Sequence, residues 1–216
     1  TTNTVDGHTI LIDQDHLERL NMALDAYLEL DGKYKFDDVL IEAEFSLTDH
    51  IGGTCDILAY NATHVIVLDW KFGQGIAVDP VENAQGMFYA MCAEQTLPDL
   101  FKGKQIVIAI VQPMPSRHDF GTLKTWEVPA KHFSAFKQTY MKAVKSKGYQ
   151  TGSHCTFCAG AATCPLKVQD ASAALRMDAT NLVSLSAALA LATQLEPWIK
   201  EVKKIAHEQL EQGATV

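Results

Sequence analysis

The stretch that decides the fold is GTCD at residues 53–56, followed shortly by VIVLDWK at residues 65–71. Both lie in apolar runs that predict neighbouring strands joined by a short turn. Because side chains two apart on a strand point to one face, Asp69 and Lys71 should face the same way. If Asp56 faces that way too, two carboxylates and an ammonium converge at the strand ends. Carboxylate oxygens suit Mg²⁺ or Mn²⁺, and a lysine beside them can orient or activate water.

The sequence around these strands predicts an α/β (α+β) fold with a mixed central sheet flanked by helices. The run at 65–68 is apolar on both faces, which places its strand at the centre of the sheet. An alternating pattern over residues 38–47 predicts the preceding strand, with one apolar face made of Val39, Ile41, Ala43, Phe45 and Leu47. Further strands are expected at 104–111 and 124–128, and helices at 13–30, 80–95, 129–147 and 171–195, with Asp79 capping the second helix and Pro197 opening a last one.

The composition is typical of a soluble globular chain: of 216 residues, 47% are hydrophobic and 20% are charged. No apolar run reaches membrane-spanning length and no basic-then-apolar leader is seen, so we expect no membrane partner and a cytoplasmic location. The formal net charge of −8 argues against a non-specific nucleic-acid coat, but local basic patches matter more than the sum. Five cysteines without a leader argue against a disulfide framework.

A helix after the second strand adds polar groups to the same place. Gln85 and Tyr89 are four residues apart, so they share one helix face. An amide and a phenol there can hydrogen-bond a phosphate, a base edge or a metal-bound water. A single Asp at a strand edge is most often a turn residue, and a single helical Tyr is most often core. The functional interpretation therefore depends on several such residues converging.

Taken in order, GTCD at 53–56, DWK at 69–71 and the Gln85-x-x-x-Tyr89 helix resemble the PD-(D/E)XK nuclease superfamily, in particular its RecB-type and CRISPR-associated exonuclease domains. The second acid here is Asp69, where Glu is commoner. The resemblance implies a restriction-endonuclease-like core and a Mg²⁺- or Mn²⁺-dependent deoxyribonuclease. It covers residues 38–212, and the tail from Trp198 onward resembles phage- and prophage-encoded RecB-like proteins, which implies a phage-infected or prophage-bearing bacterial host.

The resemblance also implies the ligands of the metal. Asp56 and Asp69 would bind it, with the backbone carbonyl of Trp70 as a further ligand. Glu44, on the preceding strand, either holds the metal through water or is a surface acid.

The remaining residues of the motif have implied roles in the reaction. Lys71 would orient or activate the attacking water, and Gln85 and Tyr89 would position the DNA strand or support Lys71. The implied activity is phosphodiester hydrolysis by an exonuclease in phage recombination or replication. Its partners would be single-stranded DNA or duplex ends, together with phage recombination or replication proteins.

A cluster of cysteines follows the predicted core. Cys155, Cys158 and Cys164 have the spacing Cys-x₂-Cys-x₅-Cys, and thiolates so spaced suit Zn²⁺ or an iron–sulfur cluster. The resemblance favours a [4Fe-4S] cluster, with Zn²⁺ as the alternative. Free buried thiols are the structural alternative.

Two residues that the family usually supplies upstream are missing. Its fourth cysteine lies before the catalytic strands, where this chain has none; neither Cys55 nor Cys92 is an obvious substitute, and His154 is a further candidate. The family also places a metal-binding histidine on an upstream helix, where His16 is a weak match. We therefore expect a fragment or a shortened member of the family.

The expected organisation is a RecB-like nuclease core at 1–150, lacking its N-terminal part, a cysteine knuckle at 151–168 and a helical segment at 169–216 that packs on the core. A lysine-rich helix at 131–147 is either a path for DNA or a solvated basic face. The alternatives to a nuclease are a catalytically idle RecB-like module that binds a DNA end or a protein, and a zinc structural protein.

Overall fold

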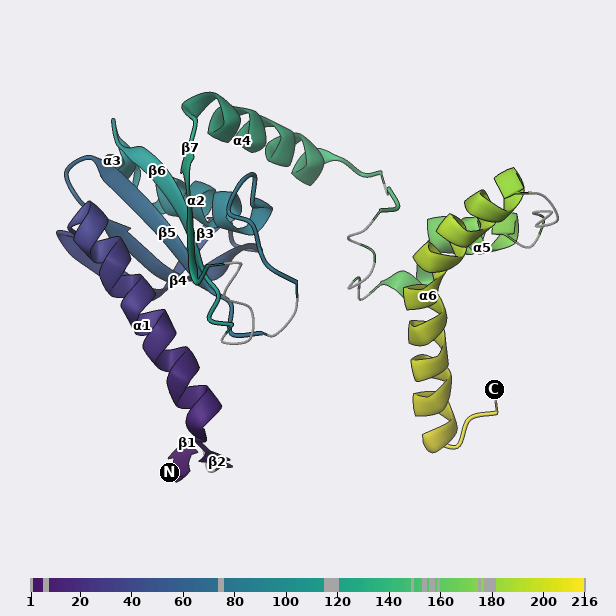
Figure 1. Cartoon of the computed structure of the whole chain (residues 1–216). Helices are drawn as coiled ribbons and strands as arrows, with labels where there is room; N and C mark the ends of the chain where they lie inside the picture. The colour runs from purple at the N-terminus through teal and green to yellow at the C-terminus, as the bar shows by residue number, and fades with distance from the viewer. Residues whose placement is uncertain are drawn as a thin grey trace. The chain divides into compact units, whose positions relative to one another are not determined.

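The computed structural model describes residues 2–5, 8–73, 76–114, 121–148, 150–152, 155, 158, 160–174, 176 and 182–215 (Figure 1). The chain forms two compact units, Thr1–Lys145 and Ser146–Val216. None of the helices in the described part of the chain is both long enough and apolar enough to cross a membrane.

The first unit is built on a five-stranded sheet in the order β3-β4-β5-β6-β7. Neighbouring strands are antiparallel except for β5 and β6, which are parallel. This confirms the mixed sheet with the 65–68 strand at its centre. The strands are β3 (Asp38–Thr48), β4 (Ile51–Tyr60), β5 (His64–Trp70), β6 (Gln105–Val111) and β7 (Leu123–Val128).

Helices cover both faces of this sheet (Figure 1). On one face α1 (Gln14–Tyr34) packs Ala26 and Leu30 against Ile66 of β5. On the other face α2 (Ala84–Thr96) and α4 (Ala130–Lys145) pack Ala90 and Phe133 into the cluster around Val67. A short helix α3 (Pro98–Phe101) follows α2, and a hairpin of β1 (Thr2–Val5) and β2 (His8–Leu11) precedes α1. The sequence did not predict this hairpin.

Strand β5 determines where the polar end of the sheet lies. Val65 and Val67 face the α2 cluster, while Ile66 and Leu68 face the α1 cluster, and all four side chains are buried. Burial of each such side chain stabilises the fold by about 1.5–3 kcal/mol. The alternation directs the next odd-numbered residue, Asp69, towards α2.

The predicted regular alternation in β3 was wrong. Val39 packs in the cluster beneath α1, whereas Ala43 and Phe45 pack in the cluster beneath α2. The change of face falls at Glu42, whose φ of 49° lies in the left-handed region and interrupts the pleat. As a result Ile41 is 69% exposed instead of sharing the face of Phe45.

The start of α2 also differs from the prediction. The N-cap is Asn83, whose side chain accepts a hydrogen bond from the Gly86 N–H, and not Asp79. Asp79 accepts instead from Val81 N–H in a local turn, and Glu82 has a left-handed φ of 53°. A helix cannot pass through that conformation, so it begins after it.

The second unit contains a 3₁₀ turn η3 (Ala161–Thr163), α5 (Pro165–Ala174) and α6 (Leu182–Glu211), which contact one another. Pro197 lies inside α6, so the prediction that it opens a separate helix was wrong. The residues on either side of it show why the helix continues. Leu195 is buried, and the indole N–H of Trp198 donates to the carbonyl of Ala162 in η3 at 3.3 Å. The expected packing of the tail on the core stays a prediction.

Candidate active site

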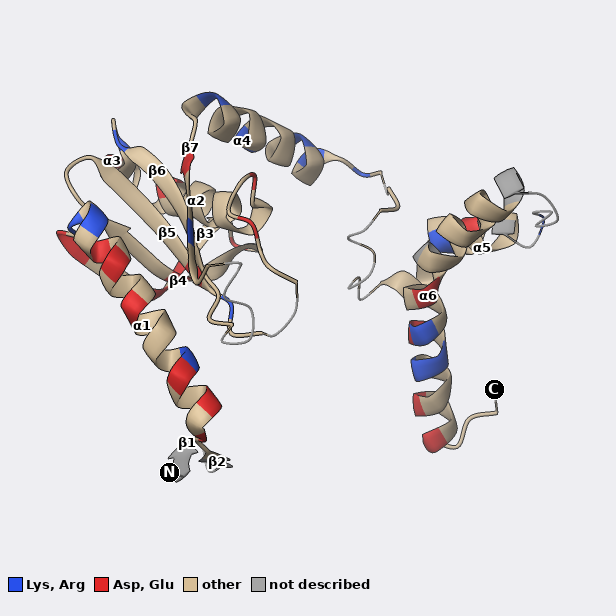
Figure 2. Ribbon diagram, in the orientation of Figure 1, with Lys and Arg blue, Asp and Glu red and all other residues tan. Residues whose placement is uncertain are grey.

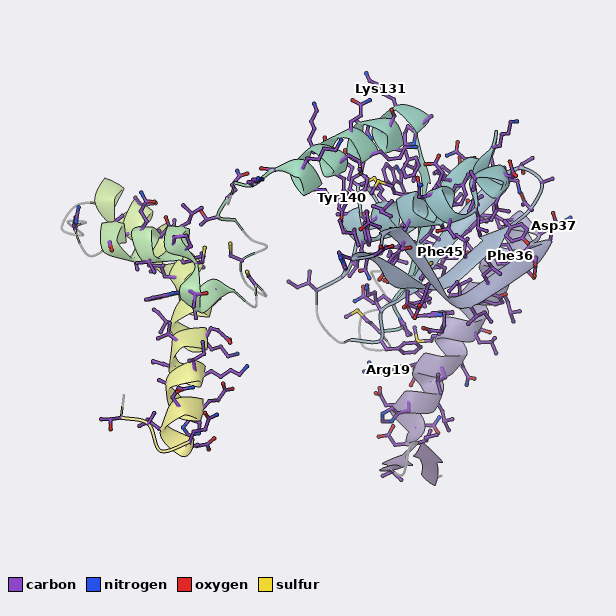
Figure 3. All side chains as sticks on the ribbon, turned by 180° about the vertical axis from the view of Figure 1, so that it is seen from behind. Arg19, Phe36, Asp37, Phe45, Lys131 and Tyr140 are labelled. Atoms are coloured by element: carbon purple, nitrogen blue, oxygen red, sulfur yellow. The ribbon has the colours of Figure 1, made fainter. Side chains whose placement is uncertain are left out.

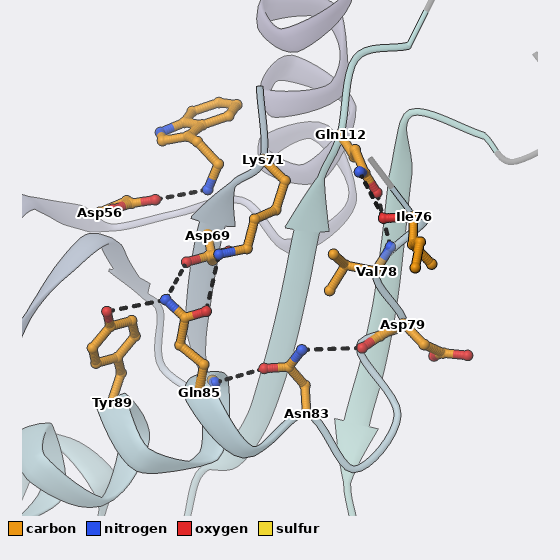
Figure 4. Close-up of polar contacts among 12 residues, drawn as sticks. Asp56, Asp69, Lys71, Ile76, Val78, Asp79, Asn83, Gln85, Tyr89 and Gln112 are labelled. Atoms are coloured by element: carbon orange, nitrogen blue, oxygen red, sulfur yellow. Dashed lines mark hydrogen bonds and ion pairs between the residues drawn. The ribbon is translucent and has the colours of Figure 1, made fainter. Parts of the chain in front are cut away.

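The ladder between β4 and β5 ends with the pair Ile57–Leu68. Asp56 and Asp69 occupy the next position along the two strands, where the strands no longer pair. In place of a further ladder bond, the Asp56 carboxylate accepts a hydrogen bond from the backbone N–H of Trp70 at 2.7 Å (Figure 4). The acid therefore lies between the diverging ends of the two strands. The residue as a whole is half-buried.

Asp69 is more deeply buried than Asp56, with 3% of its surface exposed. It is the centre of a cluster that also contains Lys71, Gln85 and Tyr89. Its Oδ2 forms an ion pair with Lys71 Nζ at 2.7 Å, and its Oδ1 accepts from Gln85 Nε2 at 3.0 Å. Burial raises the pKa of Asp69, and the charge of Asp56 adds to this effect, while Lys71 opposes it. The predicted common direction of Asp69 and Lys71 is confirmed.

Gln85 joins the members of the cluster to one another (Figure 4). Its Oε1 accepts from Lys71 Nζ at 2.9 Å, and its Nε2 also lies 3.1 Å from the Tyr89 hydroxyl oxygen, to which it donates. With the bond to Asp69, the amide uses both its acceptor and its donors inside the cluster. The predicted shared face of Gln85 and Tyr89 is therefore confirmed, and it points to Asp69 and Lys71.

Two glycines allow α2 to come this close to the sheet. A Cβ at Gly86 would lie 2.6 Å from Cγ2 of Ile108 in β6, which is closer than packed side chains approach. A Cβ at Gly53 would lie 3.0 Å from Cε1 of Tyr89. The glycine of the GTCD motif thus makes room for the tyrosine of the helix.

Glu44 and Glu42 are both on β3, next to the strand that carries Asp56. Glu44 pairs with Thr54 and lines a cavity of about 440 Å³ at the β3–β4 turn. Glu42 lies between the pairs Ile41–Ile57 and Ala43–Cys55, and so directly across from Asp56. Glu44 was predicted from the sequence and Glu42 was not, and the role of Glu44 stays a prediction.

His16 lies on α1 and is held by Asp13, whose Oδ1 is 2.6 Å from His16 Nδ1. Together with Arg19 it lines a cavity of about 570 Å³ beside Phe72, the residue after Lys71. Arg19 Nη1 donates to the Phe72 carbonyl at 3.2 Å. The structure thus places His16 next to the end of β5 but in contact with Asp13, on the α1 side of the sheet.

The donor set for a divalent cation consists of the carboxylates of Asp56 and Asp69. Hard oxygens of this kind fit Mg²⁺ or Mn²⁺. Among the described residues, no group of three or more His, Cys, Asp or Glu side chains is arranged to hold a metal ion. A cation here would need further oxygens from the backbone, water or substrate.

The cysteines fall into two groups. Cys55 and Cys92 are buried in the core beneath α2, and burial raises their pKa values to about 12 and about 11, which disfavours the thiolate that a metal needs. Cys155, Cys158 and Cys164 lie in the second unit, where the Cys158 N–H donates to the Cys155 carbonyl at 3.3 Å. His154 lies outside the described residues.

Helix α4 carries a row of exposed lysines (Figure 2), among them Lys142 and Lys145. Lys131 projects from its first turn, whereas Tyr140 turns inward and stacks near Phe88 with ring centroids 5.3 Å apart (Figure 3). This helix therefore has one face packed on α2 and one basic face in solvent.

The fold and the site define an α+β protein with an acid–lysine–glutamine cluster at the end of its central strand. A family model matches residues 14–216, and the chain belongs to that family, DUF2800, whose members are proteins of unknown function. No match was found among curated proteins. The crystal structure of SSO0001 is 13% identical over 71% of this chain and 71% of that chain, with a TM-score of 0.32, which carries no functional argument.

Proposed function

We propose that the chain is a metal-dependent deoxyribonuclease of the PD-(D/E)XK type that hydrolyses phosphodiester bonds at the cluster around Asp69. The main support is one contact: a buried carboxylate and the half-buried ammonium of Lys71 meet at 2.7 Å at the end of the central strand. The shared glutamine, Gln85, holds both groups in place. The resemblance of these motifs to RecB-type exonucleases supports the same assignment, with DNA ends or single strands as substrate.

The roles are those that the resemblance implies for these residues. Asp56 and Asp69 hold Mg²⁺ or Mn²⁺, with the Trp70 carbonyl as a further ligand. When bound, the cation supplies Lewis-acid polarisation and a lower pKa for coordinated water. Lys71 orients the attacking water and offsets the negative charge that develops on the phosphoryl oxygens. Gln85 fixes the Lys71 ammonium, because its Oε1 accepts from that group.

The cysteine cluster belongs to the same proposal. Cys155, Cys158 and Cys164 hold a [4Fe-4S] cluster, or Zn²⁺ in its place, and a fourth ligand completes the site. Thiolates and the short spacing between them suit either group. Iron and sulfide analysis of protein purified without oxygen, beside zinc analysis, tells the two apart.

A second candidate function is an idle RecB-like module that binds a DNA end or a protein. One observation favours it: both oxygens of Asp69 already have partners within the chain, Lys71 on one and Gln85 on the other. An ion pair and a hydrogen bond of this kind can stabilise the fold without a bound cation, although Asp69 Oδ2 is buried and accepts no hydrogen bond from the described residues.

The two functions are separated by incubating the full chain with end-labelled single-stranded and duplex DNA in Mn²⁺, in Mg²⁺ and in a chelator. The nuclease proposal expects shortening of the labelled strand with either metal and none with the chelator. DNA retained on the protein but left intact in both metals would contradict catalysis and favour the idle module. Release of mononucleotides from labelled ends, against cleavage of closed circles, distinguishes an exonuclease from an endonuclease.

A further inference from the structure

The side chain of Gln112 is buried, with 7% of the residue exposed, and it lies just beyond the end of β6. Its Oε1 accepts from the Val78 N–H at 2.9 Å, and its Nε2 donates to the Ile76 carbonyl at 3.2 Å (Figure 4). Both ends of the amide therefore form hydrogen bonds to the backbone of one short segment, residues 76–78. That segment lies on the connection between Lys71 and α2.

Hydrogen bonds continue from this segment into the first turn of α2. The carbonyl of Asp79, the residue after Val78, accepts from Asn83 Nδ2 at 3.2 Å. Asn83 Oδ1 in turn accepts from the Gly86 N–H at 2.9 Å. Gly86 directly follows Gln85. The segment that Gln112 holds is therefore connected by hydrogen bonds to the backbone next to Gln85, which contacts Lys71 and Asp69 in the candidate site.

The other half of the site is tied to the same end of β6. The Lys71 N–H donates to the carbonyl of Val111 at 2.8 Å, one residue before Gln112. Two consecutive residues of one strand end thus fix the backbone of Lys71 and, through the 76–83 segment, the start of α2. The described residues of this connection, 72–73 and 76–83, contain no helix or strand of their own. Side chains hold its backbone at Ile76 and Val78, through Gln112 and through Lys124 Nζ, which donates to the Val78 carbonyl at 3.5 Å.

We propose that Gln112 is a positioning residue that keeps Gln85 in register with the Asp69–Lys71 pair; this inference rests on the proposed function of that pair. Gln85 meets Lys71 and Asp69 at 2.9 and 3.0 Å. A shift of about 1 Å at the start of α2 breaks both contacts and can cost about 100-fold in rate. Gln112 touches neither substrate nor metal in this account and acts through the segment alone.

The test compares Gln112→Met with Gln105→Met in the full chain. Methionine keeps the length of the side chain and removes its hydrogen bonds. Gln105 is a matched control at the opposite end of β6, because its Nε2 also donates to backbone carbonyls, those of Ile106 at 2.9 Å and Val128 at 2.8 Å. We expect Gln112→Met to lower kcat for Mn²⁺-dependent DNA cleavage by about tenfold or more with KM changed by less than about threefold. Gln105→Met should leave both constants within about twofold.

A second readout does not depend on activity. In amide NMR spectra, Gln112→Met should speed the solvent exchange of the Gly86 N–H by about tenfold and shift the side-chain NH₂ signals of Gln85. Gln105→Met should change neither. Gln112→Glu keeps an acceptor for Val78 but loses the donor to Ile76. Its Gly86 exchange rate and Gln85 signals should lie between those of the wild type and Gln112→Met. This variant provides the test if Gln112→Met does not fold.

The outcomes separate the two proposals. A wild-type chain without nuclease activity whose Gly86 exchange still responds to Gln112→Met defeats the proposed function and leaves the positioning role standing. Gly86 exchange and Gln85 signals that are the same in Gln112→Met and Gln105→Met overturn the positioning role, whatever the activity.

Discussion

The carboxylate of Asp56 accepts a hydrogen bond from the backbone N–H of Trp70 at the point where β4 and β5 stop pairing. In a continuous ladder a backbone carbonyl would be the acceptor. A side chain has replaced it, so the acid is held at the divergence of the strands, and the same contact places Asp56 beside Asp69.

This contact predicts different effects for two substitutions at Asp56. Asp56→Ala leaves the Trp70 N–H without its acceptor and should lower the free energy of unfolding by about 1–3 kcal/mol. Asp56→Asn keeps an oxygen for that N–H and should change it by less than about 1 kcal/mol, while removing the charge that a cation needs. Urea unfolding followed by tryptophan fluorescence measures both. Equal destabilisation by the two variants would show that the hydrogen bond does not hold the strand ends.

The close approach of α2 predicts opposite effects at two helical glycines. Gly86→Ala places a methyl group against Ile108 and should destabilise the protein by about 1–3 kcal/mol. Gly32→Ala, on α1, meets no atom within 4 Å and should stabilise it by up to about 1 kcal/mol. Thermal unfolding of both variants tests the packing. If Gly86→Ala were as stable as the wild type, α2 would not lie directly on β6.

The register of β3 predicts which glutamate assists the acids. Glu42 lies across from Asp56, so Glu42→Gln should weaken Mn²⁺ binding by about tenfold, as loss of a nearby carboxylate commonly does. Glu44→Gln, whose residue pairs with Thr54, should change it by less than about twofold. Calorimetric titration with Mn²⁺ gives both affinities. The opposite order of effects would favour Glu44 as the third acid.

Burial predicts which cysteines react. The pKa values of about 12 for Cys55 and about 11 for Cys92 leave almost no thiolate in mildly alkaline solution, and both thiols are buried. In the metal-free protein, iodoacetamide should therefore modify Cys155, Cys158 and Cys164 of the second unit. It should leave Cys55 and Cys92 of the first unit unmodified. Peptide mass spectrometry over a rising pH series reads this out. Loading with Zn²⁺ or iron and sulfide should protect the second unit, and modification of Cys55 as fast as Cys158 would contradict the buried placement.

The basic face of α4 predicts a salt-dependent contribution to DNA binding. Charge reversal of Lys142 and Lys145 together should reduce the salt slope of DNA affinity by roughly two, at about one counterion for each lysine. The double variant Lys203→Glu and Lys204→Glu on α6 is the matched control. An unchanged slope in the α4 variant would leave that helix as a solvated face.

Much of the site could be predicted because its parts are local. Alternation along β5 fixes the common face of Asp69 and Lys71, and helical spacing fixes that of Gln85 and Tyr89. Nothing local, however, sets the distance between the two elements. That distance depends on contacts far apart in the chain: Gly86 on Ile108, and Gln112 on residues 76–78.

Two of the errors share one physical cause. A left-handed residue interrupts the regular period, at Glu42 in β3 and at Glu82 before α2, and neither is a glycine that would have marked the position. Pro197 has a different explanation. It was expected to begin a new helix, but tertiary contacts on both sides of it keep α6 continuous. Local preference is a weak guide where packing decides.

The most direct test of the nuclease assignment is the single-turnover rate of Mn²⁺-dependent DNA cleavage by Asp69→Asn and Lys71→Met. The matched control is Lys137→Met, which breaks another lysine–carboxylate pair of the first unit, that of Lys137 with Glu94 at 2.5 Å. We expect a loss of about 100-fold or more in each of the first two variants, because each removes charge from the reacting centre, and a change of less than about twofold in the control. Cleavage by Asp69→Asn or Lys71→Met at the wild-type rate would contradict the assignment.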